Sequence, residues 1–162
     1  MNLPRWNQKK INGKPINEMG CCGVFAVAYV AGKPIDEVFE LFKKRYRKTS
    51  RWQGRTTSVI RHEMLNHLGV RCKSMEPGMV KTIKIPYPDG IKEAYAGTSS
   101  MTLAKWVDLN TAKGKTYIVD TTGHVQVVHD GIVHDQHGSK PVDVFWGRRK
   151  RVREATQIIH TP

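Results

Sequence analysis

A cysteine and a histidine, far apart in this chain, stand where the fold could join them for nucleophilic catalysis. Cys22 opens an almost uncharged run that ends at Gly32, and His124 opens a valine-rich run. The dipole and unpaired N–H groups of a helix that begins at Cys22 would lower the pKa of its thiol. An imidazole beside that thiol could accept its proton and later protonate a leaving group. The pair predicts Cys22 as nucleophile and His124 as general base.

A third group has to orient the imidazole, and cross-strand geometry points to Asp135. Asp130-Gly131 is the preferred dipeptide of a tight two-residue turn between two antiparallel strands. Pairing outward from this turn places Asp135 one diagonal step from His124, on the same face of the sheet. We therefore expect Asp135 to contact the His124 ring, on the face that receives the nucleophile.

The same register leaves specific alternatives. His134 should pair with Val127 and point to the opposite face, which makes it a poor substitute base. A β-bulge would shift the register by one residue and turn the expected carboxylate away. Asp120 or a backbone carbonyl would then orient the imidazole, and His137 is a further candidate.

Helices precede strands along most of the chain, which predicts an α+β fold with N-terminal helices packed on a C-terminal antiparallel sheet. Apolar spacing, capping residues and glycine stops predict helices over 22–32, 34–46, 58–68 and 102–109. Valine-rich and alternating runs predict strands over 116–119, 124–128, 132–134 and 142–146. One or two short strands are expected between 70 and 85, followed by a turn at 86–90.

The length fits a single domain. The 162 residues, 39% of them hydrophobic, are enough to bury a core without disulfides. A polar segment rich in turn-forming residues predicts an extended lead-in over 1–19. One domain over 20–147 should follow, and then a basic tail over 148–162.

Cysteine and histidine usage predicts free thiols and no metal. The three cysteines, two of them adjacent, make a poor disulfide framework, and no signal pattern or membrane-spanning run is present. We therefore expect a cytoplasmic protein without membrane contact, in which Cys72 is structural. His62 and His67 resemble part of a zinc-protease motif, but five residues apart on a helix they diverge by about 140°. We expect neither a metal nor another cofactor.

Short motifs between about residue 17 and residue 146 follow the order of a known family. They are Cys22-Gly-Val with Ala26, the segment 31–38, Leu68-Gly69, Thr102-Leu103-Ala104, the segment 114–119, Gly123-His124 and the segment 130–135. Together they resemble the papain-like cysteine peptidase fold, in particular the leader-cleaving peptidases of bacteriocin exporters. The chain is still more similar to small cysteine-peptidase-like proteins encoded by bacteriophages and prophages.

This resemblance implies a hydrolase that cleaves a peptide, isopeptide or related amide bond in a peptide or protein substrate. It implies that Cys22, His124 and Asp135 carry the reaction, and a phage-encoded protein would act in the host cytoplasm. The sequence departs from the family near the nucleophile. The family's oxyanion-donating glutamine, six residues before the cysteine, is replaced by Ile16, and Asn17 is the candidate donor in its place. Losing one such donor costs about 10²–10³ in rate.

The chain is strongly basic, with a net charge of +13 and a pI near 9.9. A charge of this size favours anionic partners. The cations concentrate in 43–48 and in the C-terminal run of Arg148, Arg149, Lys150, Arg151 and Arg153, the candidate anion-binding residues. No motif of a known nucleic-acid-binding module accompanies them. The alternative function is therefore a catalytically inactive basic module of the same fold that contacts nucleic acid or an acidic host or virion protein.

Overall fold

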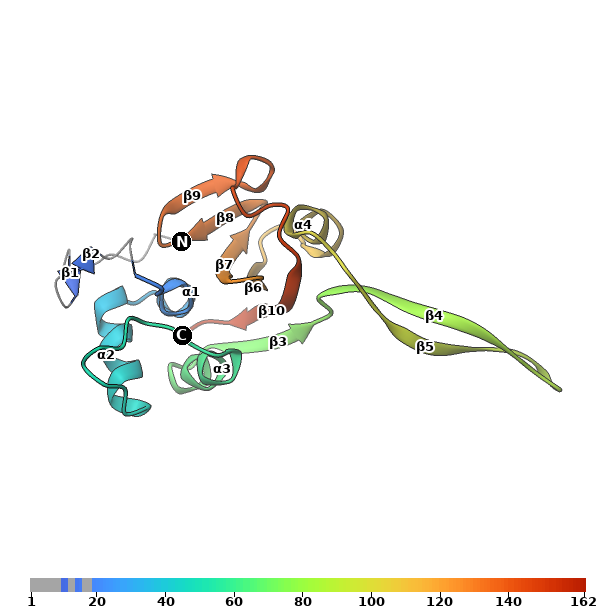
Figure 1. Cartoon of the computed structure of the whole chain (residues 1–162), viewed down its shortest axis with the longest axis horizontal. Helices are drawn as coiled ribbons and strands as arrows, with labels where there is room; N and C mark the ends of the chain where they lie inside the picture. Colours follow the sequence, from blue (N-terminus) through green and yellow to red (C-terminus); the bar gives the residue numbers. More distant parts are fainter. Residues whose placement is uncertain (1–9, 12–13, 16–18) are drawn as a thin grey trace.

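The computed structural model describes residues 10–11, 14–15 and 19–162, and they form an α+β protein (Figure 1). The helices are α1 (Cys22–Ala31), α2 (Ile35–Arg45), α3 (Ser58–His67), α4 (Leu103–Asn110) and a 3-10 turn, η2 (Val142–Val144). The strands are β1 (Lys10–Ile11), β2 (Lys14–Pro15), β3 (Arg71–Met75), β4 (Gly78–Tyr87), β5 (Gly90–Ser100), β6 (Thr116–Thr121), β7 (His124–His129), β8 (Ile132–Asp135), β9 (Gly138–Pro141) and β10 (Val152–His160). None of the helices in these residues is long and apolar enough to span a bilayer.

A six-stranded antiparallel sheet forms the centre of the body, in the order β3-β10-β6-β7-β8-β9. Helices cover both of its faces. On one face, α1, α2 and α3 pack against side chains that include Ile118, Val125 and Val127. On the other face, α4 buries Trp106 against side chains that include Val128. The predicted α+β class and the packing of the N-terminal helices on the sheet are confirmed.

Local sequence explains the ends of the helices that frame the site. Nearly every side chain of α1 is buried, and the helix ends at Gly32, whose φ of 65° is in the left-handed region that glycine tolerates best. Two other helices begin with a threonine that accepts a hydrogen bond from the backbone, Thr57 from Ile60 and Thr102 from Lys105. Ser58, which also has a hydroxyl, is the first residue of its helix and not the cap.

The β7–β8 hairpin has the predicted turn and register. Asp130 and Gly131 have φ values of 47° and 75°, as a type I′ turn requires. Outward from the turn, His129 pairs with Ile132, Val128 with Val133 and Val127 with His134. No bulge interrupts β7 and β8, so this part of the prediction is confirmed.

The C-terminal segment differs from the prediction. Residues 148–162 do not form a tail outside the domain, because they contain β10, which lies between β3 and β6. Val152, Ala155 and Ile158 of this strand are buried in the core. Cationic residues precede and flank them, so the sequence shows no clear alternation of apolar and polar residues. The strand expected over 142–146 is instead the 3-10 turn η2, and β9 just before it was not expected.

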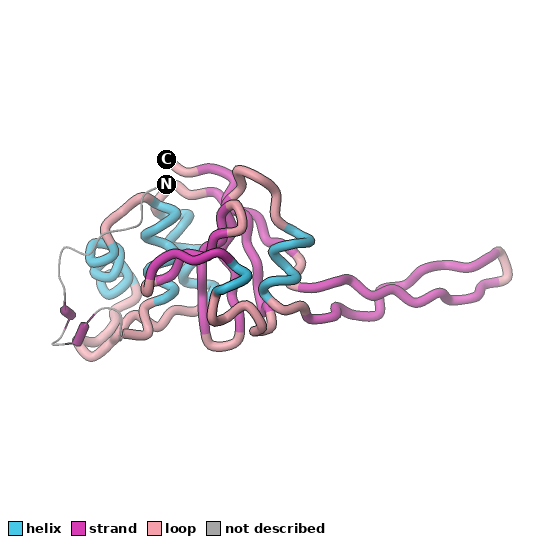
Figure 2. Tube along the Cα trace, turned by 90° about the horizontal axis from the view of Figure 1, so that it is seen from above, coloured by secondary structure: helices cyan, strands magenta, loops and turns pink. Residues whose placement is uncertain are grey.

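A long hairpin projects from the body. Strands β4 and β5 pair over nearly their whole length and extend well beyond the sheet (Figures 1 and 2). The sequence predicted only short strands here, although the turn near Pro88 is confirmed. Large apolar side chains are exposed along this arm, namely Met79, Ile83, Tyr87, Ile91 and Tyr95.

Candidate active site

Cys22 is the first residue of α1, and its side chain is half-buried at the positive end of the helix dipole. Gly23 follows it because the neighbouring loop closes tightly on the start of the helix. A Cβ at residue 23 would clash with Oγ1 of Thr56, so a larger residue there would require this loop to shift. Cys22 therefore lies beside the loop that precedes α3, and residues of both line one pocket.

His124 and Asp135 meet across the β7–β8 hairpin, as predicted. His124 Nε2 lies 2.9 Å from Asp135 Oδ2, and both side chains are almost completely buried. The other carboxylate oxygen, Oδ1, accepts a hydrogen bond of 2.9 Å from the backbone N–H of His137. His137 therefore fixes the carboxylate of Asp135 through its backbone N–H and does not itself orient the His124 ring. The bond at Nε2 leaves Nδ1 of His124 for the thiol.

The position of α1 corrects one part of the prediction. His134 points away from His124, as expected, but it points to the face on which α1 lies and stacks on Tyr29 with ring centroids 4.8 Å apart. The face that carries His124 and Asp135 is therefore not the one covered by the helix. Cys22, His124 and Val125 nevertheless line one pocket, and His124 influences the pKa of the Cys22 thiol, because the helix N-terminus reaches the point where β7 begins.

The electrostatics of the three residues favour a thiolate–imidazolium pair. Burial raises the pKa of Cys22, but a hydrogen bond from His124 and the charges of His124 and Arg61 lower it below its ordinary value. Burial lowers the pKa of His124, but hydrogen bonds to Asp135 and Cys22 and their negative charges raise it from 6.5 to about 9. Despite burial, the same bond to His124 lowers the pKa of Asp135. Near neutral pH these directions favour negative Cys22 and Asp135 on either side of positive His124.

The other two cysteines have the opposite electrostatics. Cys21 is fully buried, and burial raises the pKa of its thiol to about 12. Burial also raises the pKa of Cys72. Neither sulfur is in a disulfide. A nucleophilic thiolate near neutral pH is therefore expected at Cys22 alone among the three.

A polar pocket of about 320 Å³ opens beside the thiol, and both Cys22 and His124 line it. Arg61 lies in its wall, forms an ion pair with Asp120, and donates hydrogen bonds of 3.2 and 3.1 Å to the carbonyl and hydroxyl oxygens of Thr56. Asp120, an alternative orienter in the sequence, therefore pairs with Arg61 and not with the imidazole. Sequence reasoning did not identify Arg61 as part of the site.

Trp146 forms a second wall of the site. Its ring centroid lies 5.0 Å from that of His124, and Phe145 lies on the same side. A smaller pocket of about 150 Å³ begins here and includes Asp135 and Lys140 in its lining. The first pocket is lined by Cys22 and His124 and the second by Asp135, so both depressions adjoin the His124–Asp135 pair.

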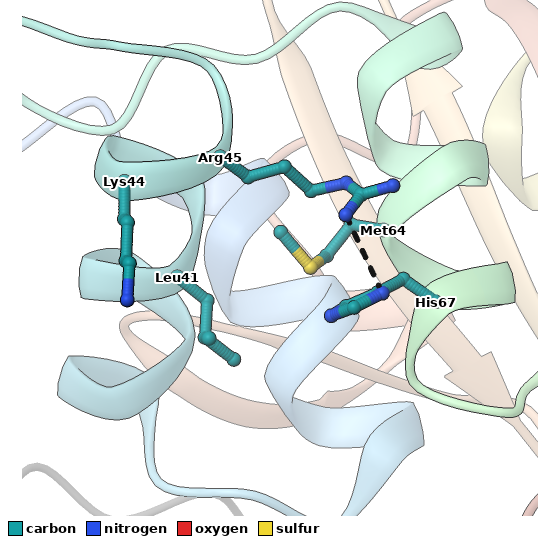
Figure 3. Close-up of a pocket in the computed structure, with 5 residues that line it drawn as sticks. All are labelled: Leu41, Lys44, Arg45, Met64 and His67. Carbon is teal, nitrogen blue, oxygen red and sulfur yellow. Dashed lines mark hydrogen bonds between the residues drawn. The ribbon is translucent and has the colours of Figure 1, made fainter.

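A larger pocket, of about 420 Å³, lies elsewhere, between α2 and α3 (Figure 3). Arg45 and His67 point toward one another across it, with Arg45 Nη1 3.5 Å from His67 Nδ1. Lys44 adds a third basic side chain. No cysteine lines it, and its basic and aliphatic side chains do not form a nucleophile–base pair, so its size does not make it the reaction site.

The remaining predicted residues have mixed outcomes. Asn17 lies outside the described residues, so its role as oxyanion donor stays a prediction. The C-terminal cations precede and enter β10, and several donate to the backbone, as Arg148 does to the Phe145 carbonyl and Arg151 to the Ser100 carbonyl. Within the described residues no cluster of His, Cys, Asp and Glu side chains could hold a metal ion.

The chain has no match in three comparisons. Models of known protein families, curated proteins and solved structures were each compared with it, and none matched. The interpretation of the site therefore rests on the geometry of Cys22, His124 and Asp135.

Proposed function

We propose that this protein is a papain-like cysteine hydrolase that cleaves a peptide, isopeptide or related amide bond. The observation that carries the proposal is the 2.9 Å contact between His124 and Asp135 beside a pocket that both Cys22 and His124 line. A buried structural cysteine needs neither an imidazole partner nor a lowered pKa. The order thiol, imidazole, carboxylate is the arrangement that activates a nucleophile and keeps its proton available.

In the proposed reaction the Cys22 thiolate attacks the carbonyl carbon of the amide. The N-terminal N–H groups of α1 are suited to stabilise the resulting oxyanion. The His124 imidazolium gives its proton to the nitrogen, the C–N bond breaks, and the amine leaves behind a thioester. Neutral His124 then takes a proton from water, whose oxygen attacks the thioester. The acid is released and Cys22 is restored, while Asp135 holds the ring throughout.

Alkylation tests this proposal without a known substrate. We expect iodoacetamide at pH 6–7 to modify Cys22 at least about tenfold faster than Cys72, because only the Cys22 thiol has a lowered pKa. Peptide mass spectrometry after timed quenching assigns the modified residue. His124→Ala should slow the reaction of Cys22, while Cys72→Ala, the matched control, should leave it unchanged.

Equal and slow modification of the cysteines would contradict the proposal and favour the alternative, a basic binding module. One observation supports that alternative, since the cations of 148–153 have no carboxylate within ion-pair distance among the described residues. Such a module would bind duplex DNA or an acidic protein with an affinity that falls steeply with salt. Cys22→Ala would leave that binding unchanged.

A further inference from the structure

We infer that the substrate is an acidic peptide or protein, with a carboxylate side chain that docks beside the reacting bond in the pocket next to Cys22. This inference rests on the proposed hydrolase function and specifies its substrate class. The arrangement that carries it is a positively charged rim around the pocket together with one unpaired hydroxyl inside it.

The unpaired hydroxyl belongs to Thr121. This residue lines the pocket with Cys22, is 4% exposed, and has no hydrogen-bond partner for Oγ1 among the described residues. A buried hydroxyl without a partner costs free energy that a bound polar group would recover. Thr121 pairs with His124 across the β6–β7 turn, so a group that it binds lies close to the imidazole.

Arg55 supplies a cation in the same pocket. The residue is exposed, lines the pocket, and has no carboxylate within ion-pair distance among the described residues. Arg61 is also in the wall, but Asp120 already neutralises it. A guanidinium and a hydroxyl donor at one pocket are the partners that a carboxylate accepts most readily.

Lys150 and Arg153 extend the positive charge around the rim. Lys150 Nζ donates to the Thr122 carbonyl over 3.2 Å, and Arg153 Nε donates to the hydroxyl of the same residue over 3.3 Å. Thr121 and Gly123, on either side of Thr122, line the pocket. Lys150 also lies 4.6 Å from the centroid of Trp146, the aromatic wall beside His124.

The acidic residues near the site do not cancel these cations. Asp120 is paired with Arg61 and Asp135 with His124, while Glu154 accepts a hydrogen bond of 3.2 Å from the neutral hydroxyl of Ser58 and keeps its negative charge. Among the described residues, three cations without a carboxylate partner, Arg55, Lys150 and Arg153, therefore outnumber the one carboxylate left without a cation, that of Glu154. A peptide is favoured over a nucleic acid as the ligand because the cations border a thiolate and an imidazolium, which together act on acyl groups.

Two alkylating reagents of similar size and different charge test the inference. Iodoacetate carries a carboxylate and iodoacetamide is neutral. The rate of iodoacetate divided by the rate of iodoacetamide at Cys22 therefore reports the local electrostatic potential. Relative to the same ratio for N-acetylcysteine, we expect it to be about threefold to tenfold higher in this protein at low salt and to fall as salt is added. The variants Arg55→Gln and Thr121→Val should each lower it, as should the double variant Lys150→Gln and Arg153→Gln. Lys84→Gln, on the projecting arm, is the matched control and should leave the ratio unchanged.

Protection by polymers identifies the class of ligand. We expect poly-L-glutamate to slow the reaction of Cys22 with iodoacetamide, and poly-L-lysine to leave it unchanged. The variants Arg55→Gln and Thr121→Val should weaken this protection. Protection by duplex DNA and not by polyglutamate would overturn the inference in favour of a nucleic acid.

The outcomes separate this inference from the function on which it rests. Slow reaction of Cys22 with both reagents would overturn the hydrolase. Fast reaction with iodoacetamide, but a reagent ratio equal to that of N-acetylcysteine and unaffected by the rim variants, would overturn the acidic substrate alone.

Discussion

Replacement of Asp135 by asparagine removes the negative charge that holds His124 and keeps the size of the side chain. The pKa of His124 is raised from 6.5 to about 9 although burial lowers it, which corresponds to about 3 kcal/mol in favour of the imidazolium. Asp135 and Cys22 share this contribution. Because the hydrogen bond to Asp135 is the largest cause that raises it, the pKa of His124 should fall from about 9 toward its ordinary value in the variant.

The sign of the pH effect follows from the two coupled groups. The ion pair exists above the lowered pKa of Cys22 and below the raised pKa of His124, so its upper limit in the wild-type protein is about 9. Asp135→Asn should move this limit toward neutral pH. The weaker imidazolium should also let the pKa of Cys22 rise, so that iodoacetamide modifies it roughly tenfold more slowly at pH 7.

NMR titration of the ring Cε1–H of His124 measures the shift directly. The control is Asp108→Asn, which removes an exposed carboxylate on α4 and should leave the titration unchanged. The reasoning is refuted if His124 titrates near 6.5 in the wild-type protein. It is equally refuted if Asp135→Asn leaves a high value unchanged, because hydrogen bonding to Asp135 would then not be its cause.

Two further perturbations separate the site from the scaffold. Arg61→Met should lower the free energy of unfolding by about 3 kcal/mol, because it leaves the carboxylate of Asp120 unpaired in a largely buried place. Adding Asp120→Asn should recover part of that loss. Chemical denaturation measures both, and equal stability of the single and double variants would show that the ion pair matters little. Deletion of 79–99, with a two-residue turn joining the paired ends of the arm, should lower the melting temperature by less than about 4 °C, because β4 and β5 contact each other far more than the body. A much larger loss in a thermal melt would show that the arm stabilises the sheet.

Local signals explain the parts of the structure that the sequence predicted well. The dipeptide Asp130-Gly131 prescribes its own turn, and the turn prescribes the register of β7 and β8. The contact between His124 and Asp135 then depends on only a few residues of counting. Helix α1 was equally clear, because its long apolar run ends at a glycine.

Non-local pairing explains most of what was missed. Strand β10 pairs with β3 and β6, both far away in sequence, and its buried residues alternate irregularly around a bulge near Arg153. Charge explains why Arg61 was not predicted as a residue of the site. Its spacing to Met64 and Leu65 places it on the buried side of α3, which is a signal that could have identified it, but an arginine in a basic chain reads as a surface residue.

The two contacts of His124 depend on different parts of the fold. Its bond to Asp135 is made within one hairpin, which carries its own turn and register. Its contact with Cys22 depends on how α1 sits on the sheet, through core packing and the close approach of Gly23 to Thr56. A change in helix packing could therefore separate the thiol from the imidazole and leave the imidazole bound to its carboxylate. The hairpin orients the His124 imidazole, while the packing of α1 decides whether this imidazole can activate the Cys22 thiol.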